Sequence, residues 1–427
     1  MRPGKKEKMM KKRLSLILIL SLAATLMLSG CFFRGILNEV NKLGDPGEVI
    51  EFKCEVLEEK VRDVIKKPTG DIYERDVIMI PELSLRDEAV SDLSPLSYFI
   101  NLRTLDLSGT GISDISSLSE VTELVTLYLD DNQISDLSPL STLIHLKSLF
   151  VKNNQISDIA PLSNLRSLQN LALPQNAISD LSPLSVLADL QRLYISDNDV
   201  SDITALSTLT NLQHLDLSGN TVSDISDLFG LTNLVWLDVT NNGITDISSL
   251  SNLINLEYLV IYTNQVTDIS PVASLTNLQY LVLAQNKISD ISPLANLAKM
   301  ETLYLNENQI SDISPLSNLT DLESLFLYVN QISDISPLSN LTNLQRLDIE
   351  ENDISDISSL TDLTKLEILI LFDNRISDIS PLSNLNDLTF LDLSDNPINS
   401  SETPNSVRKP DLDFKVDGMT YEVWVVE

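Results

Sequence analysis

Apolar residues recur along this chain with a period of 22 residues, from position 80 to position 398. The segment LTDLESLFLYVNQISDISPLSN, residues 319–340, is followed directly by LTNLQRLDIEENDISDISSLTD, residues 341–362, with leucine and isoleucine in matching places. The leading position falls at 80, 102, 124 and onward to 388 without an insertion, which gives 14 complete units and the opening of a fifteenth. A fixed period of this length predicts a solenoid of stacked coils.

Each unit supplies seven apolar side chains to a common interior, and a single coil cannot bury them. In the unit that begins at position 322 they are Leu322, Leu325, Leu327, Ile332, Ile335, Leu338 and Leu341. Stacked neighbours bury them in one continuous core. The spacing predicts a short strand over residues 325–328, and the 15 copies are expected to form a parallel sheet, roughly 70 Å long at ~4.8 Å per strand.

One asparagine recurs in each unit at the point where the strand turns inward. Backbone groups lose water at such a turn, and an amide side chain both donates and accepts hydrogen bonds there. We therefore expect a structural ladder, with a ligand-binding row of amides as the less favoured alternative. Glu88 and Thr110 interrupt the column at its N-terminal end. The column consists of Asn132, Asn154, Asn176, Asn198, Asn220, Asn242, Asn264, Asn286, Asn308, Asn330, Asn352, Asn374 and Asn396.

An aspartate column runs through the units as Asp92, Asp114, Asp136 and onward to Asp378. Aspartate before a tight helical turn caps backbone N–H groups, and the proline of pairs such as Ser314-Pro315 suits the first helical position. We therefore expect short 3₁₀ turns on the convex side. No unit has the twelve-residue calcium loop with its glycine and closing glutamate, so neither a metal nor a cofactor is expected.

Segments at both ends of the repeats, residues 51–79 and 399–427, are expected to cover the core where the stack ends. Phe52, Val56, Leu57, Val61, Val64 and Ile65 recur at helical spacing, and Pro68-Thr69-Gly70 ends that helix. Cys54 is expected to be a small buried residue of this helix. At the other end, MTYEVWVVE alternates like an edge strand.

The unit reads L-x-x-L-x-L-x-x-N-x-I-x-D-I-x-P-L-x-x-L-x-x and is identified as a leucine-rich repeat. It resembles the 22-residue version of bacterial internalins over about three quarters of the chain, residues 80–398. The resemblance implies an α/β solenoid shaped as a horseshoe, with a concave parallel β-sheet, convex 3₁₀ turns and a helical N-terminal cap. It also implies a protein partner, including the possibility of one on a host cell.

Residues 1–30 resemble a lipoprotein signal peptide. A basic start, MRPGKKEKMMKKR, precedes an apolar stretch of 15 residues from Leu14 to Leu28, and Leu28-Ser29-Gly30-Cys31 resembles a lipobox. The resemblance implies cleavage before Cys31 and diacylation of Cys31 by fatty acids such as palmitate, with residues 31–50 as a tether. The chain is then exported and membrane-anchored on the bacterial cell surface. An uncleaved signal anchor is the alternative.

Beyond residue 30 the chain is strongly acidic, with 22 basic and 60 acidic residues and a net charge of −38. Such a surface repels nucleic acid and anionic lipid head groups. No nucleic-acid partner is therefore expected, and membrane attachment is assigned to the lipid on Cys31. If Cys31 carries lipid, Cys54 has no partner for a disulfide.

Aromatic residues gather on the outer face of the predicted sheet. The third, fifth and seventh residues of each unit point away from the core, and twelve of these 45 positions are aromatic although the chain holds only 22 such residues. Units eight to twelve contribute seven of them with Asp238 as the only charge, and unit thirteen then inserts Arg346, Asp348 and Glu350. The twelve are Tyr128, Phe150, Tyr194, Trp236, Tyr258, Tyr262, Tyr280, Tyr304, Phe326, Tyr328, Phe372 and Phe390.

An apolar patch rimmed by charge marks an interaction site. We expect a monomeric surface scaffold for adhesion or recognition that binds a protein partner through all of these aromatic residues except Phe390. Glycan or cell-wall binding is a second hypothesis, with Asn306 and Thr240 placed to meet hydroxyl groups. A third is a structural surface protein whose rings only stabilise the sheet, and a cytosolic scaffold is disfavoured by the signal sequence.

An enzyme is not expected. The chain has only two histidines, His145 and His214, and no G-x-S-x-G nucleophile motif. His214 shares the concave face with Asp216 and is expected to be its solvated ion-pair neighbour.

Overall fold

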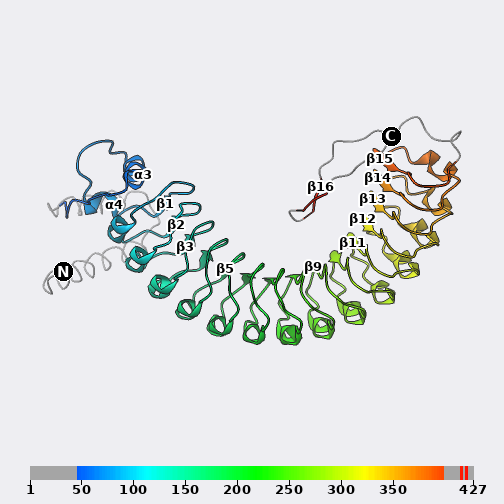
Figure 1. Ribbon diagram of the computed structural model, residues 1–427, viewed down its shortest axis with the longest axis horizontal. Coiled ribbons are helices and arrows are strands. Elements are labelled where there is room, and N and C mark those ends of the chain that lie inside the picture. Colours follow the sequence, from blue (N-terminus) through cyan, green and yellow to red (C-terminus); the bar gives the residue numbers. More distant parts are fainter. Residues whose placement is uncertain (1–45, 399–413, 417–418, 422–427) are drawn as a thin grey trace, which may run out of the picture.

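The computed structural model describes residues 46–398, 414–416 and 419–421. Residues 80–398 form a curved solenoid in which fifteen parallel strands follow one another in chain order along the concave side (Figure 1). Fourteen 3₁₀ helices, η1–η14, connect the strands around the convex side. The predicted horseshoe, its concave parallel sheet and its convex 3₁₀ turns are confirmed.

Every strand of the large sheet is three residues long. The strands are β1 (Glu82–Ser84), β2 (Thr104–Asp106), β3 (Thr126–Tyr128), β4 (Ser148–Phe150), β5 (Asn170–Ala172), β6 (Arg192–Tyr194), β7 (His214–Asp216), β8 (Trp236–Asp238), β9 (Tyr258–Val260), β10 (Tyr280–Val282), β11 (Thr302–Tyr304), β12 (Ser324–Phe326), β13 (Arg346–Asp348), β14 (Ile368–Ile370) and β15 (Phe390–Asp392).

The 3₁₀ helices are mostly five residues long and many contain the Ser-Pro pair. They are η1 (Ser94–Tyr98), η2 (Ser116–Glu120), η3 (Ser138–Thr142), η4 (Ala160–Asn164), η5 (Ser182–Val186), η6 (Thr204–Thr208), η7 (Ser226–Gly230), η8 (Ser248–Asn252), η9 (Ser270–Ser274), η10 (Ser292–Leu294), η11 (Ser314–Asn318), η12 (Ser336–Asn340), η13 (Ser358–Leu360) and η14 (Ser380–Asn384).

The strand in the unit of Leu322 differs from its predicted bounds of 325–328. It spans Ser324–Phe326 and pairs in register with β13, Ser324 opposite Arg346 and Phe326 opposite Asp348. The predicted end was two residues too late, although the backbone N–H of Leu327 still donates to the carbonyl oxygen of Asp348 at 2.7 Å. The chain then turns at Val329, whose φ of 54° lies in the left-handed region.

A left-handed residue stands at this same place in fourteen further units, two residues after the second inward leucine-like position of the strand segment. Gly109 and Gly219 adopt it without steric cost, and most of the others are Asp, Asn, Gln or Glu. Thr263 and Val329 are β-branched residues in that conformation, with φ of 54° each. A left-handed conformation is unfavourable for L-residues and is an outlier for β-branched ones.

We expect Val329→Asn to raise the free energy of unfolding by about 1 kcal/mol, because asparagine tolerates the left-handed conformation. Little burial is lost in the exchange, since Val329 is 37% exposed. Chemical denaturation measures the change. Val186→Asn is the matched control, because Val186 is also exposed and lies in the 3₁₀ helix η5. Equal effects at the two valines would contradict the assignment of strain to Val329.

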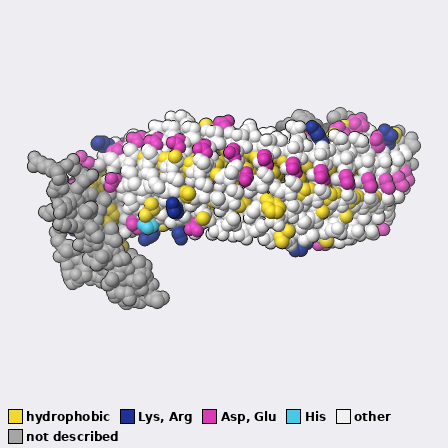
Figure 2. Space-filling view, turned by 90° about the horizontal axis from the view of Figure 1, so that it is seen from below, with side chains coloured by type: hydrophobic (Ala, Val, Ile, Leu, Met, Phe, Trp, Pro, Cys, Tyr) yellow, Lys and Arg dark blue, Asp and Glu magenta, His cyan; other side chains and the backbone are white. Residues whose placement is uncertain are grey.

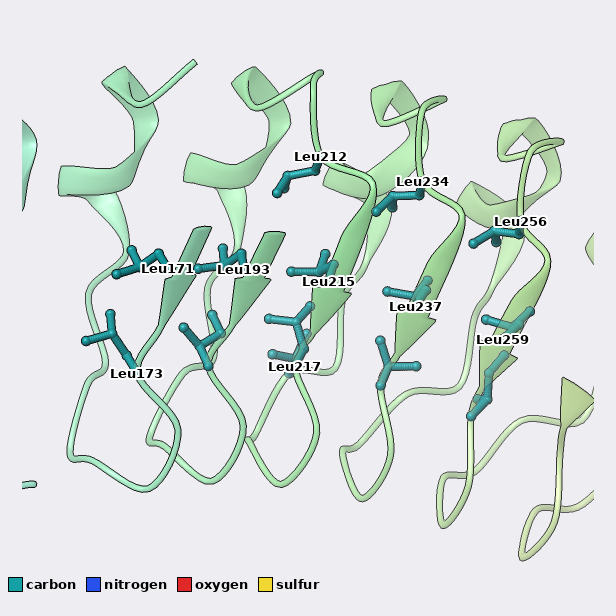
Figure 3. Close-up of a cluster of buried hydrophobic side chains, with 14 of the residues drawn as sticks. Leu171, Leu173, Leu193, Leu212, Leu215, Leu217, Leu234, Leu237, Leu256 and Leu259 are labelled. Carbon is teal, nitrogen blue, oxygen red and sulfur yellow. The ribbon is translucent and has the colours of Figure 1, made fainter. Parts of the chain in front are cut away.

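The interior is one continuous column of leucine and isoleucine that runs along the whole stack. Leu215, Leu237 and Leu259 are fully buried and lie opposite one another on successive strands β7, β8 and β9 (Figure 3). Burial of such a side chain contributes about 1.5–3 kcal/mol. Each coil is covered by its neighbours, so the stability of a coil depends on the units before and after it.

The asparagine column links each coil to the preceding one by hydrogen bonds. The Nδ2 of Asn286 donates to the carbonyl oxygen of Ile261 in the preceding coil at 2.9 Å and to those of Leu283 and Ala284 in its own coil at 3.1 Å. Its Oδ1 accepts from the backbone N–H of Val266, also in the preceding coil, at 3.0 Å. The expected ladder is therefore confirmed as a structural device, built from amide-to-backbone bonds.

The aspartate column caps the 3₁₀ helices, as expected. In each of fourteen coils the aspartate Oδ1 accepts a hydrogen bond of 2.8–2.9 Å from the backbone N–H two residues later. In coil two this bond joins Ser116 to Asp114 and lowers the pKa of Asp114. These carboxylates accept hydrogen bonds from backbone N–H groups at the start of each 3₁₀ helix, and this role accounts for the recurrence of aspartate in the column.

A second asparagine column was not foreseen. Asn211, Asn233, Asn255 and Asn277 each donate from Nδ2 to a backbone carbonyl oxygen 23 residues earlier, at 2.8–2.9 Å. These residues stand one position before the leading leucine of each unit. They form a second set of bonds between neighbouring coils, on exposed rather than buried backbone.

The N-terminal end of the stack is covered by helices α3 (Glu55–Ile65) and α4 (Glu74–Val77). Leu57 and Val61 of α3 are buried, and so is Cys54, which precedes the helix instead of lying in it. Lys66, with a φ of 56°, ends α3 before Pro68 is reached. Packing also extends before residue 51, because Ile50 is buried and its N–H donates to the carbonyl of Ile72 at 2.8 Å.

Beyond residue 398 the structure describes one antiparallel pair, β16 (Phe414–Val416) and β17 (Met419–Tyr421), which is a sheet separate from the large one. The predicted signal peptide, Cys31, residues 31–45 of the predicted tether and most of the predicted C-terminal cap lie outside the described residues. Within the described part of the chain, no helix has the length and apolar character needed to cross a membrane.

Candidate functional site

Four aromatic side chains form a continuous row across the middle of the concave face. Tyr258 and Tyr280 lie 5.8 Å apart between ring centroids, and Tyr280 and Tyr304 are also 5.8 Å apart. Tyr304 and Phe326 stack at 4.1 Å with their planes 3° apart. We call Tyr258, Tyr280, Tyr304 and Phe326 the aromatic row. It crosses strands β9–β12, so its length is set by the strand spacing.

Apolar side chains of the same face support the row. Val260, Val282 and Ala284 are buried there as a small cluster, with Tyr262, Tyr280 and Tyr304 packed against it. Pointing away from the core does not expose all of these rings to solvent, because Phe326 is only 6% exposed whereas Tyr258 is 39% exposed. Concave curvature brings side chains of neighbouring strands together, so the rings cover one another as well as the sheet.

The remaining predicted aromatic residues form smaller groups or stand alone. Tyr128 and Phe150 stack at 4.8 Å on β3 and β4. Tyr194 and Trp236 lie 6.3 Å apart across β6–β8. Phe372 makes no ring–ring contact among the described residues, and neither does Phe390. The structure thus brings together only part of the predicted set.

His214 lies in the group of Tyr194 and Trp236, 6.5 Å from the Trp236 ring. Burial lowers the pKa of His214. The expected ion pair with Asp216 is not among the salt bridges of the described residues. Asp216 instead accepts hydrogen bonds from the N–H and hydroxyl of Ser218, at 2.9 and 2.6 Å. His214 is therefore part of an aromatic contact.

Among the described residues, two buried acceptor atoms on the concave face have no hydrogen-bond partner. They are Oδ1 of Asn306, a residue 2% exposed just after β11, and Oδ1 of Asp348, a residue 6% exposed at the end of β13. Buried polar atoms are nearly always hydrogen-bonded, and an unpaired one costs about 1–3 kcal/mol. Both atoms lie beside the aromatic row, so its neighbourhood contains sites where an incoming donor would be stabilised.

The row ends in a charged group. The guanidinium of Arg346 lies 4.8 Å from the centroid of the Phe326 ring. Burial raises the pKa of Asp348 to about 8 and that of Glu350 to about 7, with neighbouring carboxylates adding to both shifts. Two carboxyl groups at this end of the row therefore change their charge near neutral pH.

The sequence carried a signal for this charged group. Arg346, Asp348 and Glu350 interrupt an otherwise apolar concave face in one unit. Sequence reasoning treated them as a rim and missed that Asp348 is buried. Only the side-chain packing around β13 distinguishes a rim from a buried carboxylate.

The opposite, convex face has a different chemistry. A row of acidic side chains runs along the molecule on this side (Figure 2), where the capping aspartates recur once in every coil. Large apolar side chains such as Ile144, Phe229 and Ile254 are exposed in or just after the 3₁₀ helices. Single exposed apolar residues are common on protein surfaces and indicate no site. Among the residues described, no group of three or more His, Cys, Asp or Glu is arranged to hold a metal ion.

The repeats match a family model described as Leucine Rich repeats (2 copies), over residues 100–142, 122–164, 188–230, 232–274, 276–318, 320–362 and 364–406. These segments cover more than half of the chain. The protein belongs to the leucine-rich repeat family.

Comparison with solved structures places it near the internalins. An internalin, inlF, from Listeria monocytogenes is 33% identical, with 82% of this chain and 92% of that chain covered and a TM-score of 0.59. The functional domain of InlJ from Listeria monocytogenes is 20% identical, with 81% of each chain covered and a TM-score of 0.68. The chain is thus an internalin-like leucine-rich repeat protein.

Plant receptor ectodomains share the fold as well. The plant peptide hormone receptor RGFR1, in complex with RGF2, is 23% identical, with 72% of this chain and 57% of that chain covered and a TM-score of 0.62. A search among curated proteins finds no match.

Proposed function

We propose that the protein is a surface scaffold that binds a protein partner on the concave face over β8–β12. The observation that carries this proposal is the aromatic row flanked by two buried acceptors without partners, Asn306 Oδ1 and Asp348 Oδ1. Aromatic rings contribute large contact area at little conformational entropy, and an unpaired acceptor gains a full hydrogen bond when a partner supplies the donor.

Stacking of the rings on one another is the competing explanation. Cross-strand ring pairs contribute about 0.2–1 kcal/mol each to a sheet, so they account for some of the aromatic residues. They do not account for Tyr258, which is 39% exposed at the end of the row. They also leave the two unpaired acceptors without a role, whereas a bound partner explains all three features.

The fold supports a binding role. Among proteins of this fold, the plant receptor RGFR1 is described in complex with RGF2, and the chain covers most of an internalin at 33% identity. We propose further that the chain is exported and held at the membrane by lipid on Cys31. Intact-mass spectrometry of the membrane fraction tests this proposal. A mature chain whose mass shows no lipid on Cys31 would exclude it.

The binding proposal is tested with two triple variants displayed on intact cells and analysed by proximity labelling. Trp236→Ala, Tyr258→Ala and Tyr304→Ala together remove rings from the concave face. Val186→Ala, Phe229→Ala and Ile254→Ala together remove the same kind of exposed apolar surface elsewhere and form the matched control. Circular dichroism establishes that both variants are folded.

We expect partners labelled by the unmodified chain to be lost with the concave variant and kept with the control variant. The expected loss in affinity is at least about 100-fold, because central aromatic residues of an interface cost 2 kcal/mol or more each when truncated. Identical labelling by the concave variant would rule out the concave face as the binding surface.

Glycan binding is the second candidate. The exposed Tyr258 ring offers a stacking surface for a sugar, and the unpaired Asn306 Oδ1 would accept from a hydroxyl group. A glycan and peptidoglycan array separates the candidates. Binding there that depends on Tyr258 and Asn306, together with no labelled protein, would replace the protein partner by a glycan.

A further inference from the structure

Three carboxylates gather on the concave face beyond the end of the aromatic row. Asp348 of β13 lies directly opposite Phe326 of β12, and Ile370 of β14 separates it from Asp392 of β15. Glu350 follows Asp348 by two residues and is half-buried on the same side. The aromatic row therefore runs directly into an acidic group, which we call the acidic end: Asp348, Glu350 and Asp392.

The carboxylates of the acidic end differ in the hydrogen bonds that their oxygens accept. Asp392 Oδ1 accepts the backbone N–H of Ser394 at 2.9 Å. Asp348 is 6% exposed, and its Oδ1 accepts no hydrogen bond. The nearest basic side chain of the same strand, Arg346, lies over the Phe326 ring at 4.8 Å. A buried carboxylate without a full set of donors is unfavourable, so an additional donor with positive charge would be strongly stabilised.

The donor that fits the acidic end is an organic cation and not a metal ion. The acidic end is not arranged as a metal site, since no group of three or more metal-ligating side chains is found among the described residues. An ammonium or guanidinium group supplies both the charge and several N–H donors. Because Arg346 already lies over the Phe326 ring, the incoming group would be placed against the carboxylates and not on that ring.

We propose that the acidic end binds a lysine or arginine side chain of the same partner whose apolar segment lies on the aromatic row. This inference rests on the proposed function of the concave face. Five strand spacings separate Trp236 on β8 from Asp348 on β13, which is about 24 Å and matches roughly seven residues of extended chain. The partner segment thus presents apolar and aromatic residues, with a basic residue at the end that reaches β13.

Selection of displayed random nine-residue peptides against the full chain tests the proposal. Four forms of the protein are compared: the unmodified chain, Asp348→Asn with Glu350→Gln, Asp362→Asn, and the concave triple variant of Trp236, Tyr258 and Tyr304. Asp362 is the matched control, because it is an exposed acid of the same unit outside the strand. The control matters since the whole chain is acidic and attracts basic peptides without any specific site.

We expect peptides selected by the unmodified chain and by Asp362→Asn to combine aromatic residues with one terminal lysine or arginine. Asp348→Asn with Glu350→Gln is expected to weaken their binding by about tenfold or more, the effect of losing one hydrogen bond to a charged group. That variant should still select aromatic peptides without the basic residue.

Three results would overturn the inference, and they are distinguishable. If the unmodified chain selects aromatic peptides with no preference for lysine or arginine, the proposed function stands and the role of the acidic end is rejected. If the concave triple variant selects the same peptides as the unmodified chain, both the proposed function of the concave face and the role of the acidic end are rejected. Tight binding of a synthetic peptide of residues 399–427, lost only on changing Asp348 and Glu350, would assign the acidic end to the chain's own C-terminal segment.

Discussion

Replacing Asn286 by alanine is expected to lower the free energy of unfolding by about 3 kcal/mol. The side chain makes three hydrogen-bond contacts through Nδ2 and one through Oδ1, all to backbone groups. Alanine leaves the backbone N–H of Val266 without its acceptor inside the protein, and each buried group that loses its partner costs about 1–3 kcal/mol. Loss of packing in the turn adds to this figure.

The loss is expected to spread beyond one coil. Leu283 O accepts from Asn286 at 3.1 Å and also from Asn308 of the following coil at 3.0 Å. Neighbouring asparagines therefore share acceptors, and the ladder couples the coils as does the leucine core. Urea denaturation measures the stability, and hydrogen exchange reports whether protection falls in the coils on both sides.

Asn252→Ala is the control, because Asn252 donates one 3.1 Å bond to the carbonyl of Phe229 on exposed backbone. We expect a change below about 0.5 kcal/mol there, as for most surface substitutions. Asn286→Asp keeps an acceptor for Val266 but places a buried carboxylate oxygen against three carbonyl oxygens, so a loss at least as large as that of alanine is expected at neutral pH. A loss at Asn286 no larger than that at Asn252 would contradict the structural role of the ladder.

Asp348→Asn is expected to stabilise the protein by about 2 kcal/mol or more at pH 8 and by only about 1 kcal/mol at pH 5. A buried charge that lacks full compensation is destabilising, and its neutral isostere removes that penalty. The groups around the carboxyl are Arg346, Glu350 and Asp392. The charge of Arg346 and a hydrogen bond from the backbone of Glu350 favour the charged form of Asp348, whereas burial and the charges of Glu350 and Asp392 disfavour it.

The direction of the pH dependence follows from the raised pKa values. Burial holds the pKa of Asp348 at about 8 and that of Glu350 at about 7 in the folded protein, whereas in the unfolded chain both groups have a pKa of about 4. Between pH 4 and pH 8 the folded protein therefore binds more protons than the unfolded chain. Its stability falls as pH rises through this window, by up to about 1.4 kcal/mol per pH unit for each such group.

Denaturation series at pH 5, 6, 7 and 8 test this dependence. The capping aspartates do not contribute in this range, since hydrogen bonds lower the pKa of residues such as Asp312. The unmodified chain is expected to lose stability from pH 5 to pH 8, and Asp348→Asn is expected to show a shallower decline. If the free energy of unfolding depends on pH in the same way in both proteins, the pKa of Asp348 is not raised by burial.

Most of the fold was predictable because one unit is repeated with little change. Leucines such as Leu322 and Leu325 recur at fixed spacing, and only a stack of coils buries them. The roles of Asn286 and Asp114 followed from elementary hydrogen-bond chemistry at a turn and at a helix start. The strand bounds differed by one or two residues, because residue spacing alone does not define where so short a strand begins and ends.

The candidate site was predictable only as a location. Alternation along a strand placed Tyr258, Tyr304 and Asp348 on the concave face, since side chains on successive residues point to opposite sides. Sequence could not tell which rings stack or which atoms lack partners. Those properties depend on rotamers and on the curvature of the sheet, and both are set by contacts among residues 22 positions apart or more.

The sequence by itself determined the solenoid, its parallel sheet, its capped 3₁₀ turns and the face that carries the aromatic residues, because periodic spacing leaves one way to bury the leucines. Only the tertiary structure decided that Phe326 is covered, that Tyr258 is open, and that Asp348 is buried with one oxygen unpaired. The physical reason is that period and polarity fix the direction of a side chain, whereas its burial and hydrogen bonding depend on the neighbours that the curved stack brings beside it.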